Sequence, residues 1–387
     1  MVRDSAGNLY GTTNVGGTVG MGTAYKVAAA GGETVLYSFP WGADGYHPTA
    51  GVTGDPTGNL YGTTSSGGTA GYGVVYKVAP TGHETVLYRF TGGADGGTPT
   101  GGVILDSAGN LYGTTTYGGA SGAGVVFKLD ATGSYTVLYT FTGGADGGHP
   151  YAGVIRDSAG NLYGTAYAGG SADYGVVYEL DTTGHETVLY SFSGGNDGAR
   201  PYAGVIRDSP GNLYGTTEEG GVRGVGIVYE LDSSGYYTPL YAFFQNGIEP
   251  LAGVTRDSAG NLYGTTSDGG SGTGSRGTVY ELEPNGLETT LHLFTGGSDG
   301  GNPEAGVILD SAGNLYGTAS AGGSADYGVV YKLDPAGNET VLYNFTGGAD
   351  GGVPAAGLTR NSAGDLCGTA LLGGKKGGGV VFVLRPQ

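Results

Sequence analysis

Six aspartates recur at one position of a repeated loop motif, and this spacing is the feature of the chain closest to a metal site. In its most regular form the motif reads F-T-G-G-A-D-G-G-x-P, and its aspartates are Asp44, Asp95, Asp146, Asp197, Asp299 and Asp350. Carboxylate oxygens are ligands that Ca²⁺ prefers. If these loops return to one mouth of a shared channel, a ring of carboxylates could hold Ca²⁺ or another hard cation. An Asp before Gly is also ordinary turn chemistry, because the carboxylate can accept hydrogen bonds from its own loop.

The remaining polar residues give little indication of catalysis. Two pairs of the five histidines occupy equivalent repeat positions, His47 with His149 and His83 with His185, so they follow the repeat rather than a unique constellation. The sequence contains no HExxH, no phosphate-binding loop before a helix, and no recognisable arrangement of Ser, His and Asp. Paired carboxylates for glycoside cleavage depend on the fold and stay open at this point. We predict a protein that is not an enzyme and needs no cofactor, with Ca²⁺ as the one candidate ion.

The elements that carry these loops belong to an internal repeat of about 51 residues. The string GNLYGTT at 7–13 or a near copy of it returns seven times. The copies begin at Gly7, Gly58, Gly109, Gly160, Gly211, Gly260, Gly313 and Gly364. Self-similarity at such a period is typical of repeat architectures. Because the repeat covers the whole chain without a linker, we predict one domain over residues 1–387.

Each unit reads as four short strands, here named A to D. In residues 151–192 the runs AGVI, NLYGT, GVVYEL and ETVLYSF are separated by Gly, Asp and Ser clusters. Alternating side chains and tight Asp-Gly turns indicate antiparallel strands and no helix. A four-stranded sheet recurring at this period favours an all-β fold, a β-propeller of eight blades, over a β-solenoid. The eighth unit ends after its strand C, so we expect the last blade to lack its outer strand and to expose an edge.

The loops between strands B and C, and between strand D and the next strand A, hold nearly all the differences between units. Variable loops on a uniform frame are typical of binding surfaces, although drift without selection would look the same. Aromatic loop residues suit stacking on a glycan, and basic ones break the repeat. The candidates are Trp41, Tyr72, Tyr117, Tyr174, Arg223, Arg276, Tyr327 and Lys375.

Composition limits the classes of partner and compartment. The formal net charge is -18, which makes nucleic acid and anionic membrane surfaces poor partners. No run of apolar residues is long enough to span a membrane as a helix, and the first residues do not read as a signal peptide. The single cysteine, Cys367, excludes an intramolecular disulfide.

The recurring strings G-N-L-Y-G-T-T, G-V-V-Y-K-L and L-Y-x-F-x-G-G-x-D-G resemble the GloVer tandem repeats of bacterial proteins, a family also called choice-of-anchor. The resemblance runs over the whole chain, for example at Gly109–Thr115 and Gly124–Leu129. It implies an extracellular or cell-surface location and carries no activity over to particular residues. The chain departs from the family pattern because we recognise neither an export signal nor a C-terminal anchor in it.

Two functions from different classes follow. The first is a structural or interaction scaffold that contacts proteins, including copies of itself through the unpaired edge of the last repeat. The second is a binding module for a glycan, a peptide or Ca²⁺ on the variable loops. The near identity of the units slightly favours the scaffold, because a dedicated asymmetric site needs blades that differ.

Overall fold

In the computed structural model, every regular element among the described residues is a β-strand. The structure describes residues 1–29, 33–244, 247–270, 274–360, 364–374 and 379–385. Within these ranges, 31 strands form eight separate antiparallel sheets in chain order, seven of four strands and the last of three. This confirms the eight-bladed β-propeller with an incomplete last blade that the repeat predicts. The prediction of a single domain over residues 1–387 stays a prediction.

Strands A have two residues each: β1 (Val2–Arg3), β5 (Thr53–Gly54), β9 (Ile104–Leu105), β13 (Ile155–Arg156), β17 (Ile206–Arg207), β21 (Thr255–Arg256), β25 (Ile308–Leu309) and β29 (Thr359–Arg360). Strands B carry the LYGTT string: β2 (Leu9–Thr13), β6 (Leu60–Thr64), β10 (Leu111–Thr115), β14 (Leu162–Ala166), β18 (Leu213–Thr217), β22 (Leu262–Thr266), β26 (Leu315–Ala319) and β30 (Leu366–Ala370).

Strands C are β3 (Thr23–Val27), β7 (Val74–Val78), β11 (Val125–Leu129), β15 (Val176–Leu180), β19 (Ile227–Leu231), β23 (Thr278–Leu282), β27 (Val329–Leu333) and β31 (Val380–Leu384). Strands D are β4 (Glu33–Ser38), β8 (Glu84–Arg89), β12 (Tyr135–Thr140), β16 (Glu186–Ser191), β20 (Tyr237–Ala242), β24 (Glu288–Leu293) and β28 (Glu339–Asn344).

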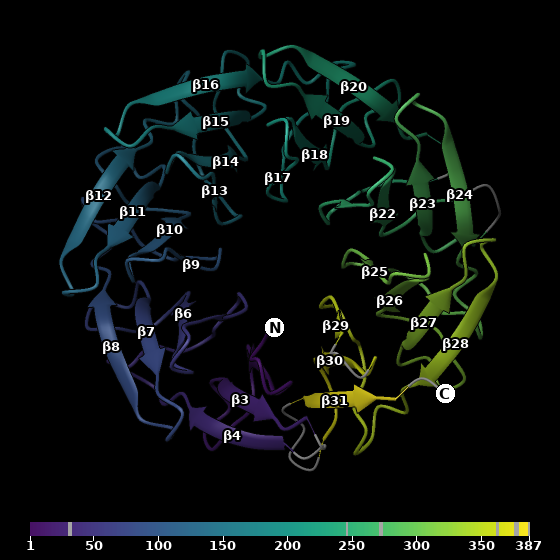
Figure 1. The fold of residues 1–387 in the computed structure, drawn as a ribbon, viewed down its shortest axis with the longest axis horizontal. Coiled ribbons are helices and arrows are strands. Elements are labelled where there is room, and N and C mark those ends of the chain that lie inside the picture. The colour runs from purple at the N-terminus through teal and green to yellow at the C-terminus, as the bar shows by residue number, and fades with distance from the viewer. Residues whose placement is uncertain (30–32, 245–246, 271–273, 361–363, 375–378, 386–387) are drawn as a thin grey trace. The chain divides into compact units, whose positions relative to one another are not determined.

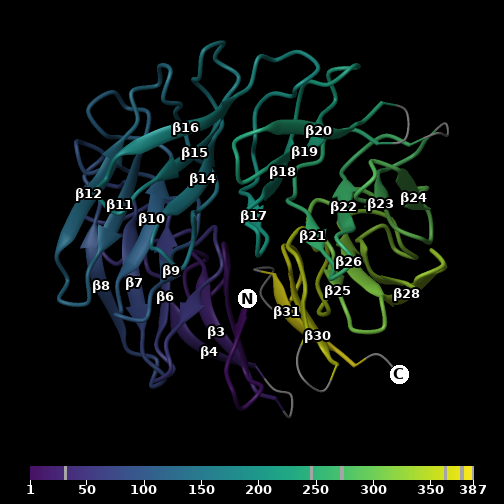
Figure 2. The same cartoon turned by 45° about the horizontal axis from the view of Figure 1, so that its top comes forward.

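The contacts divide the chain into two compact units, Met1–Phe192 and Ser193–Gln387, and each contains four sheets. In the first unit the sheets follow one another face to face, with strands A on one side and strands D on the other (Figure 1). The second unit repeats this order from β17 to β31. Figure 2 shows the same succession of sheets in each unit from another direction.

Apolar residues on facing sides of consecutive sheets form the core of each unit. In the first unit, Val75 and Phe90 of one sheet pack with Val125, Phe127 and Leu129 of the next, and all five are almost fully buried. Alternation along strand C supplies both faces, since neighbouring side chains point to opposite sides of a sheet. The core therefore lies between sheets, and the turns and loops lie at the strand ends.

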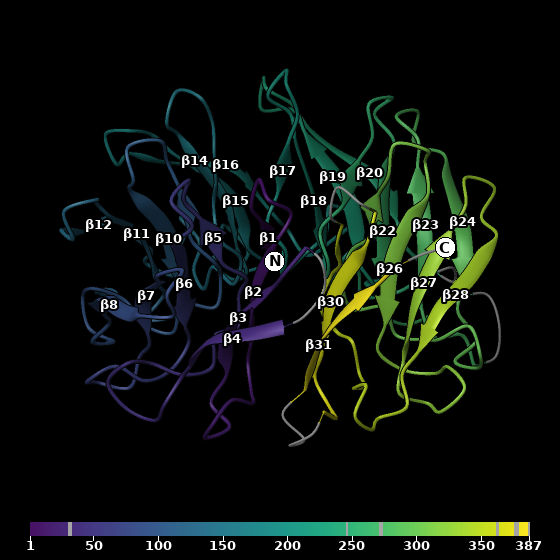
Figure 3. The ribbon, with the colours of Figure 1, turned by 60° about the horizontal axis from the view of Figure 1, so that its bottom comes forward.

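Antiparallel pairing places two sets of connections at opposite ends of every sheet. The turns from A to B and from C to D lie at one end, which we call the turn face. The loops from B to C and from D to the next A lie at the other end, which we call the loop face. Figure 3 shows connections projecting from both ends of the strands. Within the described part of the chain, no helix has the length and apolar character that a membrane crossing needs.

Candidate functional site

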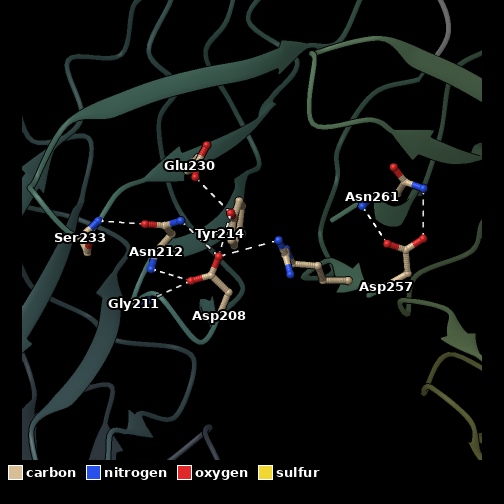
Figure 4. Close-up of polar contacts among 9 residues, drawn as sticks. Asp208, Gly211, Asn212, Tyr214, Glu230, Ser233, Asp257 and Asn261 are labelled. Carbon is tan, nitrogen blue, oxygen red and sulfur yellow. Dashed lines mark hydrogen bonds and ion pairs between the residues drawn. The ribbon is translucent and has the colours of Figure 1, made fainter. Parts of the chain in front are cut away.

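The turn face is built from one hydrogen-bonded motif that repeats with little change. In the fifth sheet, Oδ1 of Asp208 accepts the backbone N–H groups of Gly211 and Asn212, at 3.0 and 2.8 Å. Its Oδ2 accepts the Asn212 amide and the Tyr214 hydroxyl, both at 3.1 Å. Figure 4 shows this network, with Glu230 on the far side of the Tyr214 hydroxyl at 3.0 Å. Because the carboxylate accepts hydrogen bonds from its own turn and from strand B of the same sheet, we interpret this motif as structural.

Arginines from the next strand A extend that motif between sheets. The guanidinium of Arg256 lies 5.4 Å from the Tyr214 ring centre, and its Nη2 lies 3.8 Å from Oδ2 of Asp208. Arg360 has the same relation to Tyr316 and Asp310, at 5.6 and 3.9 Å. Such a cation over an aromatic ring beside a carboxylate links neighbouring sheets. We therefore attribute the uniformity of the turn face to these contacts, which hold neighbouring sheets together.

The six loop aspartates predicted as a candidate metal ring each bond within their own loop or to the strand before it. Asp95 is representative: its Oδ2 accepts the Tyr88 hydroxyl at 3.0 Å and the Thr91 N–H at 2.9 Å, and its Oδ1 accepts the Thr91 hydroxyl. Asp146 and Asp350 repeat all three contacts. Asp44 keeps only the tyrosine contact, at 3.1 Å from Tyr37.

Among the described residues, no three His, Cys, Asp or Glu side chains gather as a metal site would require. The geometry of the aspartates is that of loop caps, and Ca²⁺ binding at Asp44, Asp95, Asp146, Asp197, Asp299 and Asp350 stays a prediction. His292 replaces the tyrosine in one unit, where its Nε2 lies 3.6 Å from Oδ2 of Asp299. Burial lowers the pKa of His292 from its usual value, and the nearby Asp299 only partly opposes that shift.

The loop face combines a fixed backbone with variable side chains at one recurring position. His47, Thr98, His149, Arg200, Glu249, Asn302 and Val353 all precede a proline and all have φ between 53° and 57°. This left-handed conformation costs free energy for residues other than glycine. Thr98 shows how it is held: its N–H donates to Tyr72 O at 2.8 Å, and its C=O accepts from the Thr116 N–H at 3.2 Å. The chain thus places seven side chains of six types on one constrained backbone conformation.

A second variable position lies in the B–C loops and contains four of the predicted ligand residues. Tyr72, Tyr174, Arg276 and Tyr327 are spaced 51 or 102 residues apart and are equivalent in the repeat. A Cβ added to Gly92 would lie 2.5 Å from the Tyr72 ring, and one added to Gly347 would lie 2.4 Å from the Tyr327 ring. The two tyrosine rings therefore lie on glycines of the following D–A loop, and each tyrosine stays partly exposed.

Trp41, Tyr46 and His47 form an aromatic cluster that only the first D–A loop carries. Trp41 and Tyr46 stand where the second loop has Gly92 and Gly97. The Trp41 and Tyr46 ring centres are 4.7 Å apart, and those of Tyr46 and His47 are 5.1 Å apart. Trp41 is 64% exposed. Nδ1 of His47 lies 3.0 Å from the backbone carbonyl oxygen of Asn14, and this contact fixes the imidazole beside the Tyr46 ring.

The other predicted ligand residues lie elsewhere on the loop face. The ring of Tyr117 lies 5.2 Å from that of His149 in an edge-to-face contact. Arg223 is exposed in its own B–C loop. Lys375 lies outside the described residues. The seven predicted residues that the structure describes therefore lie on seven different loops, each within its own repeat unit.

The sequence prediction missed Tyr46 and interpreted His47 as an ordinary solvated repeat histidine. A signal for Tyr46 was present, because it replaces the last glycine of the G-A-D-G-G string. Comparison of each loop with the motif, residue by residue, would have paired it with Trp41. The contact between the two rings needs the loop conformation, which the sequence does not give.

Comparison with known proteins identifies the repeat and the fold. The family model described as the Gloeobacter/Verrucomicrobia repeat matches residues 1–159, 142–294 and 270–387. A comparison with curated proteins gave no significant sequence match.

Similar solved structures include a candidate 6-phosphogluconolactonase from Bacteroides uniformis, at 16% identity and a TM-score of 0.55 over 87% of this chain and 95% of that one. A protein from Lactobacillus plantarum matches at 17% identity and a TM-score of 0.54, over 90% of this chain and 97% of that one. Puromycin hydrolase matches at 12% identity and a TM-score of 0.54, over 88% of this chain and 52% of its own length. At such low identity these likenesses show the fold alone.

Proposed function

Because the chain belongs to the Gloeobacter/Verrucomicrobia repeat family, we propose that it is a non-enzymatic interaction scaffold, extracellular or on the bacterial cell surface, that binds glycans through its loop face. The compartment follows from the family resemblance. The absence of catalytic activity is proposed because the repeated carboxylates and tyrosines bond to one another in structural turns, and low-identity similarity to hydrolases carries no activity.

The observation that carries the proposal is the aromatic cluster of Trp41, Tyr46 and His47. Trp41 and Tyr46 replace glycines of the repeat, so the fold does not need these two rings, and the indole is largely exposed. An exposed planar ring with a polar neighbour suits the apolar face and the hydroxyls of a sugar. The net charge of -18 favours an uncharged ligand over an anionic one.

Tyr72 and Tyr327 support the same interpretation from two other loops. Each ring lies on a glycine-rich D–A loop and leaves part of its surface exposed, at 44% and 39%. Repeated aromatic contacts at a spacing set by the sheets suit a chain of sugars better than a single small molecule. A linear polysaccharide could contact Trp41 and Tyr72 of the first unit at once, and several weak contacts then add as avidity.

The test is native electrophoresis of the full chain through gels that contain soluble neutral β-glucan, mannan or galactan. We expect at least one polysaccharide to slow the protein, and Trp41→Ala to restore most of the free mobility. Tyr236→Ala is the matched control, because Tyr236 is a 70% exposed aromatic residue in a C–D turn on the turn face. Unchanged mobility in all three gels, or equal retardation of the Trp41 variant, would contradict the proposal.

The same gels separate the other two ligand classes. Retardation that disappears when EDTA is added would assign the binding to Ca²⁺ and return attention to the loop aspartates. Retardation that a mixture of peptides abolishes would favour a peptide ligand. The glycan proposal requires that neither treatment changes the mobility.

A further inference from the structure

The outer edge of β31 differs from every other strand C in the described part of the chain. The seven other strands C pair with strand B on one side and strand D on the other, whereas β31 pairs with β30 alone. All five β31 residues are half-buried, while four of five in β27 are fully buried. Its backbone N–H and C=O groups on that side are therefore available to a further strand. Figure 3 shows β31 beside β30.

The open edge is a groove with a defined shape. A cavity of about 270 Å³ lies along it, lined by Tyr343, Asp350, Val380, Phe382, Val383 and Leu384. Phe345, the residue after β28, meets the Phe382 ring edge to face at 5.1 Å between ring centres. The preceding sheet thus forms one wall, and β31 forms the floor.

The chemistry of β31 is also distinct. The fourth residue of strand C is charged in the other seven sheets and is Val383 here. Those charged residues are Lys26, Lys77, Lys128, Glu179, Glu230, Glu281 and Lys332. With this change the strand reads VVFVL and carries no charge. An uncharged apolar edge selects an extended apolar segment.

The seven complete sheets indicate which segment fits. Each strand D pairs with strand C in one register with one irregularity after the second residue, as in Val329↔Asn344, Val330↔Tyr343 and Tyr331↔Val341. The phenylalanine that follows each strand D is fully buried, and its N–H donates to the glycine before strand C. For Phe345 the acceptor is Gly328 O, at 3.0 Å. The corresponding glycine before β31 is Gly379.

We propose that the β31 groove is a docking site for an extended segment with the chemistry of strand D of these repeats, T-V-L-Y-x-F, which adds antiparallel to β31. The segment continues the pairing that the other seven sheets already show, and its phenylalanine N–H donates to Gly379 O. A second copy of the chain, paired edge to edge through β31, is the competing occupant. It is disfavoured because it brings together two chains that each carry a net charge of -18. The groove includes Asp350 of a D–A loop but none of the aromatic residues proposed to contact a glycan.

The test uses a labelled synthetic peptide with the sequence of residues 337–350, titrated with the full chain and followed by fluorescence anisotropy. We expect saturable binding, weakened at least tenfold when the peptide residue copied from Phe345 is alanine. The decisive variant carries its own strand D. In this variant a copy of residues 334–345 is added directly after Leu384, so that the added strand can occupy the groove. This variant should bind no peptide and should unfold at a higher temperature than the parent chain. Its matched control carries the same added residues with the strand sequence scrambled, and it should still bind.

Two results would overturn the proposal. One is equal peptide binding by the parent and the strand-supplying variant, which would place the peptide elsewhere. The other is a folded parent chain that does not bind the peptide. If that chain also forms a dimer that the added strand abolishes, the edge belongs to a second copy. Neither result bears on the loop face, because the electrophoresis with polysaccharides reads a different surface.

Discussion

The hydroxyl of Tyr214 lies 3.1 Å from Oδ2 of Asp208, and this contact ties strand B of the fifth sheet to the turn before it. The same carboxylate accepts three further hydrogen bonds from Gly211 and Asn212. Its contact with Arg256 reaches the next sheet. One side chain thus joins a turn, a strand and an inter-sheet contact.

Replacing this carboxylate should destabilise the second unit. We expect Asp208→Ala to lower the free energy of unfolding by about 3 kcal/mol, since several hydrogen bonds to a charged acceptor are lost at once. Urea unfolding followed by tyrosine fluorescence measures the effect. Asp232→Ala is the control, because Asp232 caps an exposed turn of the same sheet. Losses of equal size in the two variants would contradict the role given to Asp208.

Removing a buried tyrosine hydroxyl that has no hydrogen-bond partner should instead stabilise the fold. The Tyr76 hydroxyl is buried and has no hydrogen-bond partner among the described residues, and the equivalent residue in the next sheet is Phe127. We expect Tyr76→Phe to raise the free energy of unfolding by about 1 kcal/mol, because an unsatisfied buried donor is removed. Tyr88→Phe, which loses the contact with Asp95, should lower it. Thermal unfolding of the two variants tests the pair, and a loss in Tyr76→Phe would contradict the prediction.

Three glutamates at the start of strand D make stability depend on pH. Burial and a nearby aspartate raise the pKa of Glu84, Glu186 and Glu339 to about 7. A raised pKa in the folded state means that protonation stabilises the fold. This contribution is fully present below the unfolded pKa, near 4.5, and is lost as the pH rises through about 7.

Glu84→Gln should therefore unfold at a higher temperature than the parent chain at pH 8, with the difference shrinking toward pH 4.5. Measuring both proteins across this range isolates Glu84 from the other carboxylates. Glu283→Gln is the control, since Glu283 lies in an exposed C–D turn. A difference that does not change with pH would show that Glu84 is ionised in the fold throughout.

The residue before the proline of each D–A loop, which has a left-handed backbone conformation, gives a further test of stability. Val353 is β-branched and has φ of 56°, a conformation that costs about 1–3 kcal/mol for such a residue. Val353→Gly should raise the free energy of unfolding by about 1 kcal/mol after the entropy loss of glycine is subtracted. Ala355→Gly, at a position outside the left-handed region, should lower it. Calorimetry compares the two, and destabilisation by Val353→Gly would contradict the strain argument.

The sequence predicted the fold well because the fold is a repeated local pattern. The spacing of Gly7, Gly58 and their later copies gave the sheet count, and the missing strand D of the last unit predicted the three-stranded sheet that ends with β31. Strand alternation and Asp-Gly turns are local properties, so eight copies of them leave little ambiguity.

The candidate site was harder to predict because its contacts join different loops. The sequence singled out Trp41 and Tyr72 as breaks in the pattern, yet the contact of Tyr72 with Gly92 depends on the left-handed loop conformation. The groove along β31 depends on Tyr343 and Asp350 of the preceding sheet. Packing between units of the repeat is a tertiary property that spacing alone does not show.

The most direct test of the glycan-binding claim is the fluorescence of Trp41, the single tryptophan of the chain. The full chain is titrated with neutral gluco-, manno- and galacto-oligosaccharides at constant pH, and the emission maximum is recorded. We expect a saturable shift to shorter wavelength with at least one of them, because a sugar covering the exposed indole removes water from it. Tyr236→Ala should show the same shift. An emission maximum that stays constant for all three oligosaccharides, in a chain that remains folded, would contradict the account.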